Sequence, residues 1–369
     1  MSDKIIIMGY LGWIALIISL YFYIKIRKEK IKAIYYREKE KNDPKIVVIG
    51  GGTGQSVFLR GLKHHTKNIT AIVTVADDGG GSGVLREDLG MLPPGDIRNC
   101  LLALADIEPT MNEVMRYRFT EGALKGQSFG NLFLAAMNGI YDNFEIAVYK
   151  MSEIFAITGK VLPVTLSDIN LVAHLKNGEI IKGESKIPIE VKKQKTSIDK
   201  ITLEPSDVAP LEDVINSIKE ADIIVIGPGS LYTSIMPNLM VNGVVDAIKK
   251  SNAPKVYISN VMTQPGETDE YNVFNHIESI QKHTKSNIID YIIVNNKEIS
   301  EEIFKKYKNQ GSKMVLLDDK QKHELNKIGA NTIEGDFVDT SKNYVRHNSD
   351  LISKIVVDLA LSHRNNKSK

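Results

Sequence analysis

The sequence is poor in the residues that build several familiar kinds of site. It has a single cysteine, Cys100, among 369 residues, which excludes a disulfide framework and argues against a cysteine-ligated zinc site. No Gly-x-x-x-x-Gly-Lys-Ser/Thr stretch is present, so a Walker A phosphate loop is excluded. The chain also lacks a His-Glu-x-x-His stretch and a hydrolase-like order of Ser, His and Asp, and no side chain stands out as a nucleophile.

An excess of charge of one sign is confined to one short segment. The formal net charge is +2, and charged residues make up 25% of the chain. Basic residues are dense between Lys25 and Lys41, so the remainder is close to neutral or acidic. A nucleic-acid partner is therefore not expected. The hydrophobic fraction of 43% is ordinary and can supply the core of one large α/β domain or two smaller ones.

The longest uncharged run lies near the start of the chain. Residues Ile5 to Ile24 read IIIMGYLGWIALIISLYFYI, long enough to cross a bilayer core of roughly 30 Å as a helix. Lys and Arg are frequent directly after this run and scarce before it, so the positive-inside rule places the rest of the chain in the cytoplasm. A cleaved signal peptide and a buried helix are the alternatives. The sequence thus predicts a single-pass cell-membrane protein, with a transmembrane anchor over residues 1–24 and a charged linker over 25–43.

Short β-branched runs alternate with helical patterns and glycine-rich turns from Pro44 onward. A strand at Lys45–Ile49, a helix at Ser56–His65 and a strand at Ile69–Val75 form a βαβ unit with an expected right-handed crossover. Later elements are expected as strands at Ile223–Ile226, Lys255–Ser259, Tyr291–Val294 and Lys313–Leu317, and as a closing helix at Leu351–Leu361. Residues 44–362 are therefore interpreted as one α/β domain with a mostly parallel sheet, followed by a polar tail over 363–369.

One part of this domain has a different pattern, from about residue 158 to residue 205. Asn177-Gly178 is a hairpin-turn sequence between the β-type runs Leu171–Leu175 and Glu179–Ile181. This segment is predicted to be an antiparallel insertion or an extension of the sheet.

A glycine loop follows the first expected strand and precedes a helix. Backbone N–H groups of Gly51, Gly52, Thr53 and Gly54 would face a phosphate there, and the helix dipole would favour its negative charge. The third glycine of the dinucleotide-binding fingerprint is missing, so this fingerprint is only partial. The alternative is a tight turn that binds nothing.

Two adjacent acids, Asp77 and Asp78, end the second expected strand beside another run of glycines. Their carboxylates could accept hydrogen bonds from ribose hydroxyls. They could equally hold Mg²⁺ together with phosphate oxygens, or form a polar turn.

Other candidate ligand-binding residues are expected at the same edge of the sheet, where open α/β folds bind their ligands. They are the second glycine loop, with Gly227, Gly229 and Ser230; the amides Asn131, Asn260 and Gln264; and the phosphate-pairing candidates Arg86, Arg98 and Arg346.

Several motifs of the sequence together resemble those of a known family. KIVVIGGGTGQSVFLRG, VADDGGGSGVLRED and MLPPGDIRNCLLALAD, with SFGNLFLAAM, IGPGSLYTSIMPNLMV and YISNVMTQPGETDEY, closely resemble the YvcK-like family of gluconeogenesis factors. The resemblance runs from about Pro44 to the closing helix, and the wider superfamily includes the 2-phospho-L-lactate transferases. Two departures are Gly81, where the family usually has serine, and Val84, where it usually has arginine. Many members also lack the N-terminal anchor.

The resemblance implies a doubly wound, Rossmann-like fold that binds a UDP-sugar, UDP-N-acetylglucosamine in characterised members. It also implies a role in cell shape and envelope metabolism during gluconeogenic growth. Family binding regions map onto the two glycine loops, the paired acids, Asn131 and the segment from Asn260 to Gln264. A C-terminal tyrosine and arginine of the family have their best matches in Tyr307 and Arg346.

Three functions follow from these observations. The leading hypothesis is a regulator that senses a UDP-sugar without catalysis, works through an envelope-synthesis protein partner and forms a homo-oligomer. The alternative is a nucleotide-dependent transferase of phospho groups, with Asp77, Asp78 and Mg²⁺ at its centre. An NAD-dependent oxidoreductase is the third reading, and the partial fingerprint counts against it.

Overall fold

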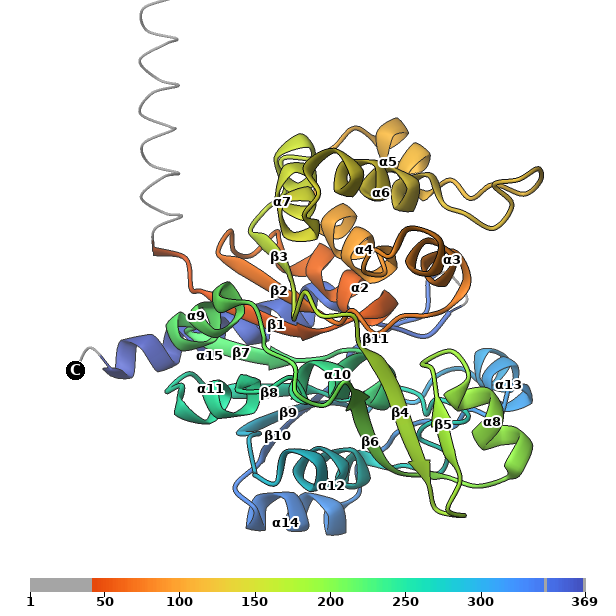
Figure 1. Cartoon of the computed structure of the whole chain (residues 1–369). Coiled ribbons are helices and arrows are strands. Elements are labelled where there is room, and N and C mark those ends of the chain that lie inside the picture. The colour runs from red at the N-terminus through yellow and green to blue at the C-terminus, as the bar shows by residue number, and fades with distance from the viewer. Residues whose placement is uncertain (1–41, 342–343, 368–369) are drawn as a thin grey trace, which may run out of the picture. The chain divides into compact units, whose positions relative to one another are not determined.

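A computed structural model describes residues 42–341 and 344–367 of the chain (Figure 1). The chain divides into two compact units, residues 1–43 and 44–369, and the folded domain is the second unit.

The domain is built on a seven-stranded sheet in which every strand pair is parallel. The strand order is β10-β9-β8-β7-β1-β2-β3. The strands are β1 (Ile46–Gly50), β2 (Ile69–Val73), β3 (Lys160–Pro163), β7 (Ile223–Ile226), β8 (Lys255–Ile258), β9 (Tyr291–Asn295) and β10 (Asn331–Gly335). The central strands are short β-branched runs that are buried on both faces, as expected for a parallel sheet covered by helices.

Helices cover both faces of this sheet. In Figure 1 the strands run from β3 at the top to β10 at the bottom, with α5–α7 beyond β3 and with α12 and α14 beyond β10. The helices are α2 (Gly52–Leu62), α3 (Gly80–Leu89), α4 (Gly95–Leu104), α5 (Pro109–Arg116), α6 (Phe129–Tyr141), α7 (Phe144–Ile154), α8 (Ile187–Gln194), α9 (Glu212–Glu220), α10 (Met236–Leu239), α11 (Val244–Lys250), α12 (Val273–Thr284), α13 (Glu301–Asn309), α14 (Asp319–Lys327) and α15 (Ser349–Lys367). A π-helical turn, η1 (Leu231–Ile235), precedes α10. The predicted doubly wound, mostly parallel α/β fold is confirmed.

The strand order reverses between β1 and β7. The chain winds from β1 through β2 to β3 in one direction, and from β7 through β8 and β9 to β10 in the other. Right-handed crossovers then place the two sets of helices on opposite faces and leave a crevice beyond the carboxyl ends of β1 and β7. Both glycine loops of the sequence begin at this crevice, one after β1 and one after β7.

Two smaller sheets accompany the main one. The strands β4 (Asn170–Leu175), β5 (Ile180–Lys182) and β6 (Ile198–Glu204) form an antiparallel sheet in the order β5-β4-β6. This confirms the antiparallel insertion, with α8 between β5 and β6. A two-stranded antiparallel ribbon is made by β11 (Val338–Asp339) and β12 (Arg346–His347).

Several element predictions need correction. Lys313–Leu317 is not a strand; it makes an isolated bridge between Met314 and Met262. The last strand is instead β10, whose mixed sequence NTIEG suits an edge position. β3 lies within the predicted insertion but pairs in parallel with β2, and its proline is tolerated because β3 is an edge strand. The closing helix runs to Lys367, beyond its predicted end.

The membrane prediction is also corrected. Within residues 42–341 and 344–367, no helix combines the length and apolar character needed to cross a bilayer. The predictions of a preceding transmembrane helix and of a single-pass location in the cell membrane are therefore not supported. The predicted anchor itself, residues 1–24, lies outside the described part of the chain.

Candidate functional site

The two glycine loops meet at the crevice between β1 and β7. A Cβ atom on Gly54 would lie 2.9 Å from the carbonyl oxygen of Pro228, and one on Gly229 would lie 3.3 Å from the carbonyl oxygen of Gly51. Such distances leave no room for a side chain at Gly54, so the loops can pack backbone against backbone only because glycine stands there. Gly52 has a φ of 67° and begins α2, so the first loop turns directly into a helix N-terminus.

A carboxyl group already lies at this helix N-terminus. The side chain of Asp96, from the first turn of α4, accepts a hydrogen bond from the Gly52 N–H. Burial and the nearby carboxylate of Asp77 raise the pKa of Asp96 to about 7. Helix α4 itself begins at Gly95 after a Pro94 cap, so Asp96 lies inside its first turn and its carboxyl serves the neighbouring helix α2.

The paired acids lie in the loop after β2 and are held by backbone groups on two sides. Asp77 accepts from the N–H of Gly79 at 2.9 Å, and Asp78 accepts from the N–H of Ser185 at 2.8 Å. Ser185 belongs to the turn between β5 and α8, so the antiparallel insertion reaches over the end of the parallel sheet. A cavity of about 380 Å³ opens beside Asp78 at this junction.

The second loop and the segment after β8 form one hydrogen-bonded network. Ser230 Oγ donates to Gln264 Oε1 at 2.5 Å, and the Gln264 amide donates to Glu267. Thr233 Oγ1 also donates to Glu267, at 3.2 Å. Asn260 Nδ2 donates to the carbonyl of Gly229 at 3.0 Å. The predicted residues Ser230, Asn260 and Gln264 are thus brought together, and Glu267 is the acid at their centre.

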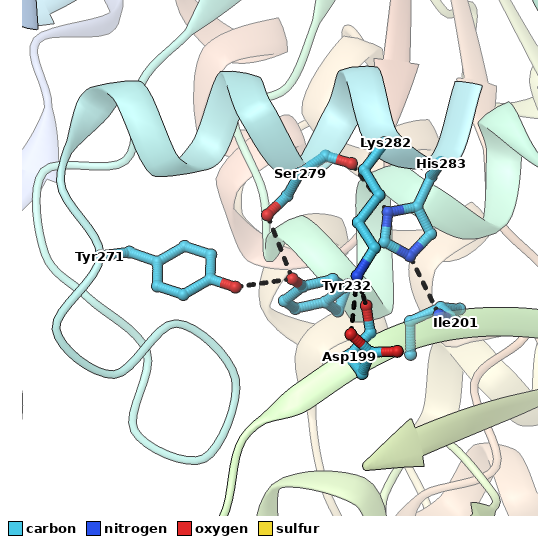
Figure 2. Close-up of polar contacts among 7 residues, drawn as sticks. All are labelled: Asp199, Ile201, Tyr232, Tyr271, Ser279, Lys282 and His283. Carbon is cyan, nitrogen blue, oxygen red and sulfur yellow. Dashed lines mark hydrogen bonds and ion pairs between the residues drawn. The ribbon is translucent and has the colours of Figure 1, made fainter. Parts of the chain in front are cut away.

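A second network fixes the turn behind this loop (Figure 2). The Tyr232 hydroxyl lies 2.8 Å from that of Tyr271 and 3.2 Å from Ser279 Oγ on α12. Two residues of α12 then bind strand β6: the Ile201 N–H donates to His283 Nε2 at 3.0 Å, and Lys282 forms a 2.7 Å ion pair with Asp199. The π-helical turn, α12 and the insertion are therefore joined by polar contacts, which positions the second glycine loop.

Five carboxyl groups gather around the crevice, and we call them the acidic edge: Asp77, Asp78, Asp96, Glu184 and Glu267. Glu184 comes from the turn between β5 and α8, and burial together with the other four carboxyls raises its pKa to about 8. Burial raises the pKa of Glu267 to about 7, against the effect of hydrogen bonds from Thr233, Tyr232 and Gln264. Near pH 7 the edge therefore holds neutral and ionised carboxyls side by side. Perturbed acids of this kind concentrate at functional sites.

The amide Asn131 lies in the first turn of α6. It is 2% exposed at the start of α6, and its Oδ1 has no hydrogen-bond partner. Gln127 Oε1, which faces Gly81 on α3, and Arg98 Nε are likewise buried and unpartnered. Asn131 directly follows Gly130, against which Arg98 packs, and within the described residues no hydrogen bond joins its side chain to the network of the second loop.

Tyr307 and Arg346 are neighbours of each other. The Tyr307 hydroxyl accepts from the N–H of Val345, directly before Arg346. Arg346 lines a cavity of about 620 Å³ with Arg60 and Val57 of α2 and the first residues of α15. This cavity lies beside α2, and no hydrogen bond among the described residues joins its two arginines to the glycine loops.

The structure also shows the surroundings of Arg86 and Val84 and bears on a possible metal site. Arg86 pairs with Asp168 at 2.6 Å and donates to the carbonyl of Ile169 through Nη2, while its buried Nη1 has no hydrogen-bond partner among the described residues. Val84 is exposed on α3 and offers only a hydrocarbon surface. Within the described residues, no group of three or more His, Cys, Asp and Glu side chains is arranged to hold a metal ion.

Sequence reasoning missed three members of the acidic edge, namely Asp96 as a site residue, Glu184 and Glu267. Each stands in a loop or first helical turn next to glycine, and this is the only local signal that the sequence offers. Their common location depends on the topology, because they lie far apart in the chain.

Comparisons with known proteins agree with this architecture. Residues 46–338 match the family described as 2-phospho-L-lactate transferase CofD. A relative from Thermoanaerobacterium thermosulfurigenes is 57% identical over 318 residues, which are 86% of this chain and 97% of that protein. The gluconeogenesis factor of Bacillus subtilis is 45% identical over 317 residues, 86% of this chain and 98% of its own. A crystal structure of a Bacillus halodurans protein, 44% identical, aligns with a TM-score of 0.81 over 85% of this chain and 99% of that one. The chain therefore belongs to the CofD family and, within it, to the YvcK-like gluconeogenesis factors.

Proposed function

We propose that this protein binds a UDP-sugar, UDP-N-acetylglucosamine in the first place, and acts as a regulator of cell shape and envelope metabolism during gluconeogenic growth. The gluconeogenesis factors among its relatives support the physiological setting. The family name, that of a transferase of a phosphorus-containing group, supports a nucleotide-related ligand.

One observation carries the choice of ligand: the acidic edge surrounds two glycine loops at the switch point of a doubly wound sheet. Switch points are where open α/β sheets bind their ligands. The loops offer close approach to backbone N–H groups, and the carboxyls and amides offer both acceptors and donors to hydroxyls. A nucleotide sugar presents both kinds of group, phosphates and a series of hydroxyls.

The raised pKa values make this edge compatible with an anionic ligand. Five ionised carboxylates would repel the diphosphate of a ligand bound nearby, whereas neutral carboxyls at Asp96, Glu184 and Glu267 would weaken this repulsion and donate hydrogen bonds to the sugar. Binding should therefore be accompanied by proton uptake near pH 8.

Calorimetric titration of the purified chain tests the proposal. UDP-N-acetylglucosamine should bind more tightly than UDP-glucose, GDP or NAD. Asp78→Asn should weaken the UDP-sugar, and Lys150→Met on the distant helix α7 should not. A chain that binds none of the UDP-sugars, while a fold check shows it intact, would contradict the proposal.

The second candidate is transfer of a phospho group, which the family description favours. In that case Asp77 and Asp78 would hold Mg²⁺ and the transferred phosphate. Each of them already accepts from a backbone N–H, so each keeps one carboxylate oxygen for another partner. Consumption of nucleotide that needs Mg²⁺, stops with EDTA and is lost in Asp78→Asn would establish this reading over the regulator.

Regulation through other proteins is part of the same proposal. We propose a homo-oligomer and an envelope-synthesis protein partner. Light scattering with and without UDP-N-acetylglucosamine tests the first, and ligand-dependent crosslinking in cells tests the second. A monomer under both conditions would contradict the oligomer.

A further inference from the structure

Arg98 is a buried cation that has no hydrogen-bond or ion-pair partner within residues 42–341 and 344–367. It stands on the first turns of α4 and is 7% exposed. Its stem packs against the start of α6, where a Cβ on Gly130 would lie 3.0 Å from Arg98 Cδ. The Nε atom has no hydrogen-bond partner, and within the described residues the guanidinium makes no hydrogen bond or ion pair. A buried guanidinium normally has such partners, because desolvating a charge is strongly unfavourable.

The charges around Arg98 have the same sign. Burial, followed by the nearby cations Arg116 and Arg118, lowers the pKa of Arg98 to about 10. The carboxyl of Asp96 acts in the opposite direction but more weakly. Arg116 donates to Asn112 at 2.5 Å and Arg118 to the carbonyl of Gly126, so both are held in place by neutral oxygens.

The positive charge continues toward the large cavity. The pKa of Arg60 is lowered by burial and then by the neighbouring cations Arg116 and Arg346, and both Arg60 and Arg346 line the 620 Å³ cavity. We call the five residues the arginine cluster: Arg60, Arg98, Arg116, Arg118 and Arg346. Across the described ranges 42–341 and 344–367, no ion pair with Asp or Glu neutralises any of them.

A buried amide completes the surroundings of Arg98. Asn131 directly follows Gly130, the residue against which the Arg98 stem packs; it is 2% exposed and its Oδ1 is unpartnered. Rotation of an amide by half a turn exchanges its oxygen for an N–H₂ group. Asn131 can therefore present a donor to an anion bound beside Arg98, which would satisfy two buried polar groups at once.

We propose that Arg98, with Arg116 and Arg118, forms an anion site that takes a phosphate or diphosphate group. Arg98 supplies the fork of N–H donors at the buried end, and the two exposed arginines close the site from solvent. The choice of a nucleotide diphosphate as its source rests on the proposed function, in which the acidic edge takes the hydroxyl groups of the same ligand. The anion site itself does not depend on that choice.

The test uses pyrophosphate as the probe and Arg98→Met as the variant, because methionine keeps much of the side-chain volume and removes the charge. Pyrophosphate affinity should fall at least tenfold. The ligand-free melting temperature should stay the same or rise, since an unpaired buried charge is removed. Arg86→Met is the matched control: this arginine is also largely buried but paired, so its loss should lower the melting temperature and leave pyrophosphate binding unchanged.

A competition arm identifies the source of the phosphate. If UDP-N-acetylglucosamine displaces pyrophosphate from the wild type, and uridine does not, the site takes the diphosphate of the nucleotide sugar. If pyrophosphate binding depends on Arg98 but no nucleotide displaces it, the site takes a free phosphate compound; the inference stands and its link to the proposed function fails.

Two results would overturn the inference. One is a wild type that binds neither pyrophosphate nor inorganic phosphate, and the other is an Arg98→Met variant with unchanged affinity. A drop in ligand-free melting temperature as large as that of Arg86→Met would also count against it, because a structural role for Arg98 would explain that drop.

Discussion

The acidic edge and the arginine cluster lie on either side of the short helix α4 and gather charges of opposite sign. Asp96 and Arg98 are two residues apart on α4, yet Asp96 faces other carboxyls and Arg98 faces other arginines. Side chains two residues apart on a helix do not face each other, so these two charges cannot form a direct pair. Here each set keeps charges of its own sign together, and both sets are partly buried.

The difference between the two regions lies in how each lowers its own repulsion. Carboxyls can take up a proton near neutral pH, and burial, which raises the pKa of three members, favours this in the acidic edge. Arginine keeps its proton at any physiological pH, so the arginine cluster can be neutralised only by an anion. The acidic edge is thus suited to hydroxyl groups, and the arginine cluster to phosphates.

The largest expected effect is a charge reversal in the arginine cluster. Arg98→Glu should lower the affinity for UDP-N-acetylglucosamine by about 100-fold or more, because a like charge then faces the diphosphate, and such contacts contribute about 2–5 kcal/mol. Titration calorimetry measures this change, and Lys150→Glu on α7 controls for the change in net charge. An equal loss in both variants would show that only overall charge matters.

A smaller effect is expected from the acidic edge. Asp78→Asn keeps the acceptor for the Ser185 N–H but removes the charge, and should weaken the UDP-sugar by about 1–3 kcal/mol. Pyrophosphate, which has no hydroxyls, should bind this variant at least as well as the wild type. An equal loss of affinity for both ligands would contradict the proposal that the acidic edge binds the hydroxyl groups and the arginine cluster binds the phosphates.

The pH dependence of stability tests the raised pKa values directly. A carboxyl with a raised pKa binds its proton more tightly in the folded chain, so its contribution is complete below the unfolded pKa and is lost as the pH rises through the folded pKa. For Asp96 this window extends from about pH 4 to its folded pKa of about 7. Urea unfolding should therefore show the wild type less stable at pH 8 than at pH 5.5.

Asp96→Asn provides the comparison for that measurement. The variant can still accept from the Gly52 N–H and carries no charge, so it should be more stable than the wild type at pH 8, by about 1 kcal/mol. Its stability should also depend less on pH. A variant that is less stable than the wild type at both pH values would refute the assignment of a largely neutral Asp96.

The smallest effect is that of salt. Raising the salt concentration from about 0.05 M to about 0.5 M should weaken pyrophosphate binding several-fold. The higher concentration shortens the screening length to well below roughly 10 Å. Binding of uridine, which is uncharged, should hardly change. The contrast would be lost if both ligands bound only through neutral hydrogen bonds.

The sequence predicted the parts of the fold in which local pattern and burial agree. β1, β2, β7 and β8 are β-branched runs followed by polar or glycine-rich loops, so their type and their ligand-facing ends could be recognised. β10 was missed because an edge strand needs little hydrophobicity. Lys313–Leu317 contains an apolar run but has no neighbouring strand to pair with. Whether such a partner exists depends on the tertiary structure and cannot be recognised from the local sequence.

The candidate site was predictable only where its residues share a motif. The glycine loops and the acids of β2 stand in recognisable strings, whereas Glu184 and Glu267 reach the crevice through the insertion and through the segment after β8. Arg98 was named as a phosphate candidate, but its burial without a partner depends on how α4, α5 and α6 pack. Such information is not contained in any local window of the sequence.

The pairing of β1 with β7 has a consequence for synthesis of the chain. Lys45, just before β1, donates its backbone N–H to Asp222, 177 residues later, just before β7 begins. A ribosome needs on the order of ten seconds to add that length. During this interval β1 and β2 can pair, but the other edge of β1 stays open and apolar, which is the kind of strand that invites pairing with another chain. We therefore expect the nascent protein to depend on a chaperone until β7 emerges, and fragments that end before Ile223 to aggregate.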